Sequence, residues 1–253
     1  MSTMLYSTWS RRWVTTCFCT AIAACGGADP TPTSTGVEGI WYGQKHSDTS
    51  GEVQSVRGMV LADGSLRALA DLETEWAGVV AIDLDGNAAL TNGFAALETT
   101  SFPSLSNSAA LTWAGAKLAD RTLRGSYASG GETGDFVLTA QDALFQGPST
   151  LADLAGSYHY AALGYNGGFF PSDFHITADG ALTGTEARGR FSGSVTLIAP
   201  NRNAYKVNLS YFDDRFPDVE QRSEYVTFAS PEQPRQLLLF AGLGVLRLVY
   251  TGP

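Results

Sequence analysis

One local pattern occurs twice in this chain of 253 residues, and it constrains the fold more than any other feature. Each copy opens with a glycine followed by aromatic residues, as in Gly39-Ile-Trp-Tyr42 and Gly156-Ser-Tyr-His-Tyr160, and each continues to an Ala-Asp-Gly turn, at Ala62 and at Ala178. Aromatic residues favour strands, and Asp-Gly favours a hairpin turn because glycine tolerates a positive φ. The repetition therefore predicts two copies of one antiparallel β unit.

The seam between the two copies lies near residue 148. Thr150 and Asp153 match a capping box, in which each side chain accepts the free backbone N–H of the other residue, and Gly156 then ends the short helix. We expect a first unit over residues 37–147 and a second over residues 149–253, joined by a short helical turn. Each unit is predicted to fold as a domain of its own.

Composition favours an all-β chain. The sequence has 28 Gly, 10 Tyr and 13 Phe but only 16% charged residues, which suits short strands and tight turns better than helices. Apolar alternation between turn residues gives about seven or eight strands per unit in meander order. The predicted architecture is two tandem small antiparallel β-barrels, because closing a sheet removes its exposed edges.

The first 24 residues have the order of a signal peptide. Arg11 and Arg12 precede an apolar run that reaches Ala24 and is too short to span a bilayer as a permanent helix. The run ends in Ile22-Ala-Ala-Cys25, which resembles the lipobox of bacterial lipoproteins and so implies cleavage before Cys25 and acylation of its thiol. The alternative is an ordinary secretory signal with an incidental cysteine.

Residues 25–36 are rich in Gly, Thr and Pro, as expected of a flexible tether behind a lipid anchor. Stable anchoring needs more than one acyl chain, which a mature lipoprotein carries. Gly26 follows the cysteine in place of the aspartate that acts as a retention signal in some bacteria. We therefore expect an outer-membrane lipoprotein, facing the periplasm or the cell surface, with the membrane bound through Cys25.

One aromatic segment of the second unit is a candidate contact loop. Tyr165, Phe169 and Phe170 surround two glycines and precede Pro171. Glycine weakens a strand and proline cannot donate to its ladder, so this segment is expected to form a loop at a barrel rim. Its rings would either anchor a protein partner or fold back to cap the barrel.

Signals for catalysis are weak. Asp173 and His175 are expected on one face of a strand, which would be half of a nucleophilic triad, but no Gly-x-Ser-x-Gly supplies a nucleophile and Cys25 is the only cysteine after the signal. No phosphate-binding glycine motif is present. A surface pair is the preferred interpretation, and we expect no enzymatic activity and no cofactor.

Two segments have the composition of metal sites without the spacing. Residues 83–87, Asp-Leu-Asp-Gly-Asn, place glycine fourth, whereas a calcium loop of the familiar kind places it sixth and a glutamate twelfth. His46, Asp48 and Glu52 lie in a Ser/Thr/Gly loop, where solvated polar residues are expected. A plain turn and a plain loop are predicted, with no metal bound.

The three tryptophans of the first unit, Trp41, Trp76 and Trp113, would suit a sugar-stacking platform or a barrel core, and the core is preferred. The formal net charge of −9 argues against nucleic acid as a partner.

The chain as a whole resembles a group of uncharacterised Gram-negative bacterial lipoproteins built from two tandem lipocalin-like barrel units. The resemblance rests on the lipobox and tether, Gly39 to Trp41, Ser149 to Tyr158, Ala178 to Gly180, Phe191 to Val195 and Asn203 to Tyr205. Such proteins often carry a cysteine pair in the second unit, which this chain lacks. The resemblance implies a fold and a location but brings no activity with it.

Two functions therefore remain open. The first is a lipid-anchored binding module with an envelope or surface protein as partner. The second is a carrier of a small apolar ligand, because an eight-stranded barrel has room for one inside.

Overall fold

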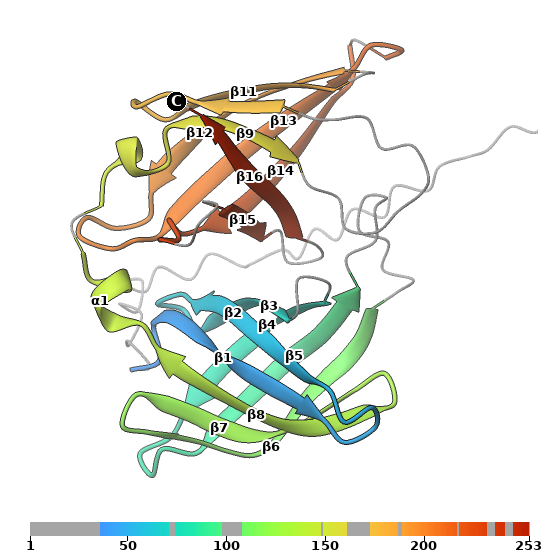
Figure 1. The fold of residues 1–253 in the computed structure, drawn as a ribbon, viewed down its shortest axis with the longest axis vertical. Helices are drawn as coiled ribbons and strands as arrows, with labels where there is room; N and C mark the ends of the chain where they lie inside the picture. Colours follow the sequence, from blue (N-terminus) through green and yellow to red (C-terminus); the bar gives the residue numbers. More distant parts are fainter. Residues whose placement is uncertain are drawn as a thin grey trace, which may run out of the picture. The chain divides into compact units, whose positions relative to one another are not determined.

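The computed structural model describes residues 36–70, 74–97, 108–147, 149–160, 173–186, 189–216, 218–231, 236–240 and 245–252. It is all-β, with two closed eight-stranded antiparallel barrels that follow one another in the sequence (Figure 1). Both barrels belong to one compact unit, residues 32–253. The prediction of two tandem meander barrels is confirmed.

Barrel 1 is a meander that closes where β1 pairs with β8. Its Asp-Gly turns form as expected: Gly64 has φ +84°, and Asp63 Oδ1 accepts the N–H of Ser65 at 2.9 Å. The strands are β1 (Gly39–Ser47), β2 (Val53–Val60), β3 (Ser65–Ala70), β4 (Thr74–Ile82), β5 (Ala88–Leu97), β6 (Ser108–Ala119), β7 (Thr122–Ser129) and β8 (Glu132–Ala140).

Barrel 2 repeats this plan and closes where β16 pairs with β9. Among the described residues, β14 and β15 have one registered pair, Val226 with Phe240, whereas β13 and β14 pair along eight positions. The strands are β9 (Gly156–Tyr160), β10 (Asp173–Ile176), β11 (Ala181–Glu186), β12 (Gly189–Leu197), β13 (Tyr205–Asp213), β14 (Glu220–Thr227), β15 (Gln236–Phe240) and β16 (Val245–Gly252).

Two strands begin earlier than their sequence patterns predict. The apolar alternation predicts strands that start at Asp135 and at Tyr225, but β8 starts at Glu132 and β14 at Glu220. The added residues are mostly polar and so lack the apolar alternation of a half-buried strand. They are extended because each hairpin continues its backbone ladder up to the turn, with Ser129 opposite Glu132 and Phe212 opposite Glu220.

The connection between the barrels is helical, as predicted. It holds one short α-helix, α1 (Asp142–Phe145), and one 3-10 turn, Leu151–Asp153. The capping box at Thr150 is present, and the Thr150 N–H donates to Asp153 Oδ2 at 2.6 Å.

Alternate residues of the described strands point into each barrel and form its core. On β13, Tyr205, Val207, Leu209 and Tyr211 are buried, as the alternation of the sequence predicts. Trp41 and Trp76 are each 1% exposed in barrel 1, and Trp113 packs against the same core, so the core interpretation of these tryptophans is confirmed.

A separate apolar cluster consists of side chains that point outward from both barrels. Its buried members are Ile40, Met59, Leu69, Phe145, Ala204, Phe228, Leu238 and Phe240. Phe145 belongs to α1 and is 3% exposed, and its carbonyl accepts the N–H of Asn203 at 2.9 Å. The connecting helix is thus fixed to both barrels.

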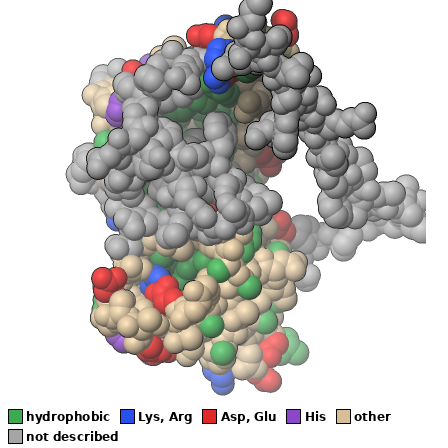
Figure 2. All heavy atoms as spheres, turned by 90° about the vertical axis from the view of Figure 1, so that its right-hand side faces the viewer, with side chains coloured by type: hydrophobic (Ala, Val, Ile, Leu, Met, Phe, Trp, Pro, Cys, Tyr) green, Lys and Arg blue, Asp and Glu red, His purple; other side chains and the backbone are tan. Residues whose placement is uncertain are grey.

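Some hydrophobic side chains also lie on the outer surface away from this cluster. In the described part of the face drawn in Figure 2, hydrophobic side chains are scattered among polar ones. Large hydrophobic side chains that are exposed among the described residues are Val53, Leu84, Val137, Ile198, Phe216 and Val219. Single exposed apolar residues are ordinary on a protein surface, so only a group of them indicates an interaction site.

Candidate functional site

The segment that leads into β1 is held to barrel 1 by side chains. Arg121 Nη1 donates to the carbonyl of Gly36 at 2.8 Å, and Arg121 Nη2 donates to that of Glu38 at 3.4 Å. Between them, Trp41 Nε1 donates to the Val37 carbonyl at 2.9 Å. Three consecutive carbonyls are therefore bound by two side chains, and we call this arrangement, together with Asp142, the Arg121 clamp.

The turn between β6 and β7 places Arg121 in the clamp. Asp120 and Arg121 have φ values of +48° and +56°, which residues with a Cβ adopt at a cost of about 1–2 kcal/mol each. Such strained positions are often found at sites with a specific role. Here the strained turn directs the guanidinium toward Asp142, whose carboxylate it contacts through Nε at 3.0 and 3.1 Å.

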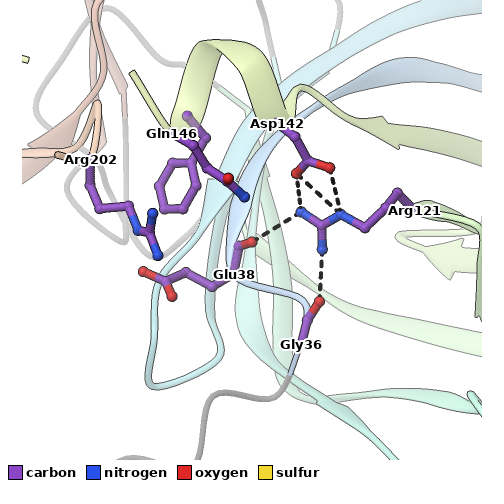
Figure 3. Close-up of a pocket in the computed structure, with 7 residues that line it drawn as sticks. Gly36, Glu38, Arg121, Asp142, Gln146 and Arg202 are labelled. Carbon is purple, nitrogen blue, oxygen red and sulfur yellow. Dashed lines mark hydrogen bonds and ion pairs between the residues drawn. The ribbon is translucent and has the colours of Figure 1, made fainter. Parts of the chain in front are cut away.

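A pocket of about 350 Å³ lies beside this clamp. Its lining residues are Gly36, Glu38, Arg121, Asp142, Phe145, Gln146 and Arg202. Figure 3 shows Arg121 and Arg202 approaching the Glu38 region from opposite sides, with Arg202 over the Phe145 ring at 5.1 Å. Each arginine comes from a turn between strands, so the pocket is built where connections meet rather than inside a barrel.

The chemistry of this pocket is hydrogen bonding rather than proton transfer. The hydrogen bond from Arg121 lowers the pKa of Asp142, so this carboxylate stays ionised at neutral pH and is unsuited to act as a general acid. The donors of Arg121 are engaged by Asp142 and the two carbonyls. Arg202 and Gln146, which lie opposite the Glu38 side chain, are therefore the lining residues that could donate hydrogen bonds to a ligand.

A second polar cluster lies inside barrel 1. Lys45 is 3% exposed, and its Nζ contacts both carboxylate oxygens of Glu132, at 3.0 and 3.1 Å. The Tyr127 hydroxyl donates to Glu132 Oε1 at 2.7 Å, and Lys45 Nζ lies 5.2 Å from the Tyr127 ring centroid and 6.0 Å from that of Trp76. Each charge is matched, as burial requires.

The pKa values of this cluster follow from its contacts. Burial, followed by the hydrogen bond to the Glu132 carboxylate, raises the pKa of Tyr127. Partial burial by itself would raise the pKa of Glu132, but the hydrogen bonds from Tyr127 and Lys45 outweigh it and lower that pKa. Glu132 is therefore kept ionised as the ion-pair partner of Lys45, and Tyr127 is kept protonated as a hydrogen-bond donor to it.

The residues predicted as sites are placed as follows. Cys25 and the contact-loop residues Tyr165, Phe169 and Phe170 lie outside the described residues. Asp83 is the acceptor of its own turn: its carboxylate receives the N–H groups of Asp85 at 2.9 Å and Asn87 at 2.8 Å, as a plain turn requires. No cluster of three metal-ligating side chains occurs among the residues that the structure describes.

The histidines pair across strands. His175 Nδ1 lies 3.2 Å from Ser157 Oγ, and Asp173 Oδ1 lies 3.0 Å from His159 Nδ1. Asp173 therefore orients the other histidine, because β10 lies beside β9 with Asp173 opposite His159. All four side chains lie on the exposed outer face, as the preferred surface interpretation expects. His46 Nδ1 is 3.9 Å from Asp48 Oδ1, and both side chains are about half exposed.

Sequence reasoning missed the Lys45 cluster and the Arg121 clamp. The Lys45 cluster has a signal in the sequence, because Lys45 lies four residues after Trp41 on the inward face of β1, where an apolar residue is expected. The Arg121 clamp has no such signal, because it joins residues that are far apart in the sequence.

Comparison with known proteins gives no relative: no protein family, curated protein or solved structure matches the chain. Within the described residues, no helix has the length and apolar character needed to cross a membrane.

Proposed function

We propose that this chain is a lipid-anchored, non-catalytic binding module of the bacterial cell envelope that contacts its partner through the outside of its barrels. The observation that carries the proposal is the packing of aromatic side chains inside the described part of each barrel. In barrel 1, Trp76 packs 5.1 Å from Tyr127 and 6.0 Å from Phe136, measured between ring centroids. In barrel 2, Phe191 packs 4.9 Å from both Phe174 and Tyr211. In the described part of each barrel, aromatic side chains thus take up interior space that a carried ligand would need, which supports the binding module over the carrier.

The electrostatics of the described residues support a binding role over catalysis. Glu132 and Asp142 each have a lowered pKa because a basic or hydroxyl group donates to the carboxylate. Catalytic acids and bases need the reverse, a pKa moved toward neutral pH. The proposal of a lipid anchor rests on Ile22-Ala-Ala-Cys25 and on the tether that follows.

The Cys25→Ser variant tests the lipid anchor, and native mass spectrometry tests whether the protein carries a ligand. Cys25→Ser removes the thiol that would be acylated, so the protein should leave the membrane pellet or retain its signal peptide, and wild type should pellet. Native mass spectrometry of the protein purified in soluble form should give the mass of the polypeptide alone. Unchanged pelleting of a processed Cys25→Ser protein would remove the lipid anchor. A stoichiometric small apolar molecule would favour the carrier function instead.

A further inference from the structure

The turn between β13 and β14 exposes two apolar side chains that are three residues apart in the sequence. Phe216 is 60% exposed and Val219 is 53% exposed, in a hairpin that projects from one end of barrel 2 (Figure 1). Phenylalanine is a residue that proteins usually bury, and exposure of this extent is unfavourable in water. Exposed apolar side chains at a projecting turn are typical of a protein interaction site in its unbound state.

The tip is ordered by its own hydrogen bonds. The Phe216 N–H donates to the Asp213 carbonyl at 2.9 Å, and the Val219 N–H donates to the Phe216 carbonyl at 2.9 Å. Arg215 binds the Asp213 carboxylate through its backbone N–H at 2.8 Å and through Nε at 2.9 Å, and its guanidinium lies 5.7 Å from the Phe216 ring centroid. A preformed tip loses little conformational entropy on binding, which favours affinity.

The charge of the tip is negative. Arg215 is matched by Asp213, and Arg222 Nη2 is matched by Glu220 Oε2 at 2.7 Å. Asp214 and Asp218, which flank Phe216, form no ion pair within the described part of the chain. In the sequence, Phe216 is thus flanked by two carboxylates that have no ion-pair partner among the described residues, and a complementary surface would be cationic around an apolar centre.

The β4–β5 turn of barrel 1 also exposes an apolar side chain between two aspartates, and it serves as a comparison for the Phe216 tip. Leu84 is fully exposed between Asp83 and Asp85 in the β4–β5 turn. There the Asp83 carboxylate is engaged by the turn itself, through the backbone and the side chain of Asn87. The Leu84 turn offers one aliphatic side chain, whereas the Phe216 tip offers an aromatic ring with an arginine beside it, which is the composition of binding hot spots.

The same charges disfavour a lipid surface as the occupant. Asp214 and Asp218 would approach the headgroups together with Phe216, and anionic lipids repel carboxylates. A protein pocket can instead place lysine or arginine opposite each carboxylate while it encloses the ring.

We propose that Phe216, supported by Val219, inserts into an apolar pocket of a partner protein whose rim carries basic residues opposite Asp214 and Asp218. This inference rests on the proposed binding function and names the surface that performs it.

The test uses the full acylated chain in its own envelope. A photoreactive amino acid replaces Phe216 in one variant and Leu84 in a matched control. The variant at 216 should give a protein adduct at a yield at least about tenfold above that at 84. The partner is identified by mass spectrometry and purified for binding measurements with the full chain. Equal yields at the two positions would overturn the inference, and so would adducts formed only with lipid or with a second copy of this chain.

Binding to the purified partner gives the second arm. Phe216→Ala should weaken the affinity about 30-fold, the loss expected for one interface anchor, and Leu84→Ala should leave it unchanged. Asp214→Asn with Asp218→Asn should mainly slow association and reduce its dependence on salt. Because Phe216 is exposed, the melting temperature of Phe216→Ala should match wild type, which separates lost binding from lost folding.

The outcomes distinguish the inference from the function on which it rests. A partner that binds Phe216→Ala as tightly as wild type overturns the inference and leaves the binding function standing. Absence of any protein adduct at both positions, together with a small molecule inside the purified chain, overturns both.

Discussion

The two barrels share a topology but fill the same end of the interior differently. At the end where β1 finishes, barrel 1 holds the ion pair of Lys45 and Glu132 with the Tyr127 hydroxyl. At the corresponding end, where β9 finishes, barrel 2 holds the rings of Phe191 and Tyr211. The strand order therefore does not depend on whether polar or aromatic groups complete the core.

An inward glycine makes room for a tyrosine ring in each case. A Cβ added to Gly134 would lie 1.8 Å from the His46 carbonyl oxygen and 3.0 Å from the Tyr127 ring. A Cβ on Gly189 would lie 2.7 Å from the Tyr211 ring. Small residues facing large ones are how a narrow barrel fills its interior, and both barrels follow this rule with different large residues.

Separating the barrels should have the largest effect. Residues 37–147 and 149–253, made as two proteins, should each give a β-type circular dichroism spectrum and a cooperative melt. Both should be less stable than the full chain, because Phe145, Ile40 and Phe240 lose apolar contacts worth about 1.5–3 kcal/mol per fully buried side chain.

Barrel 2 should lose more stability than barrel 1 on separation, since β14 and β15 have one registered pair among the residues that the structure describes. Thermal melts of the two proteins and of the full chain measure this difference. If neither half melts cooperatively while the full chain does, the prediction that each barrel folds by itself is wrong.

The buried ion pair should matter more than a surface one. Lys45→Met leaves Glu132 without its cation, and we expect a loss of about 2 kcal/mol in unfolding free energy, below the 3–5 kcal/mol of fully buried pairs because Glu132 is 34% exposed. Adding Glu132→Gln should restore part of the loss. The control is Lys206→Met in barrel 2, whose pair with Glu224 is exposed and should cost at most about 0.5 kcal/mol. Urea unfolding measures both losses. Equal losses of unfolding free energy for the two lysine variants would contradict a larger contribution of Lys45 to stability.

The pH dependence of stability gives the smallest and most specific signal. The pKa of Glu132 is lowered in the folded state, so its stabilisation is present above the usual glutamate value of 4.5 and is lost as the pH falls through the folded pKa. The pKa of Tyr127 is raised, so its contribution is complete below pH 10 and is lost as the pH rises through the folded value.

Urea midpoints between pH 7 and pH 3 measure the acid side of this dependence. Glu132→Gln should flatten the decline relative to wild type. An identical decline in both proteins would show that other carboxylates, such as Asp142, cause the acid sensitivity.

Local patterns predicted most of the fold. The Asp63-Gly64 turn and the alternation from Tyr205 to Tyr211 each depend on neighbouring residues, so the sequence contains the whole cause. Strand starts at Glu132 and Glu220 were missed because a ladder with the partner strand, rather than the apolar pattern, extends them.

The sites were less predictable because they depend on contacts between distant residues. The Arg121 clamp joins Gly36, Arg121 and Asp142, which only a closed barrel brings together. Asp173 was expected to lie with His175, yet the strand register gives it His159 as partner. The exposed Phe216 follows three charged residues in a turn, which is a signal that sequence inspection could have used.

The Arg121 clamp also determines how mechanical load enters the molecule. A force applied to the chain before Gly36 reaches the barrel first through the carbonyls of residues 36 to 38, and then through β1, which has a hydrogen-bonded neighbour on each side. Because Arg121 lies in the β6–β7 turn and also binds Asp142 at the start of α1, the pull is divided among several segments instead of peeling one strand from its end. Under the proposed anchoring through Cys25, this division of the load would oppose the opening of the first barrel.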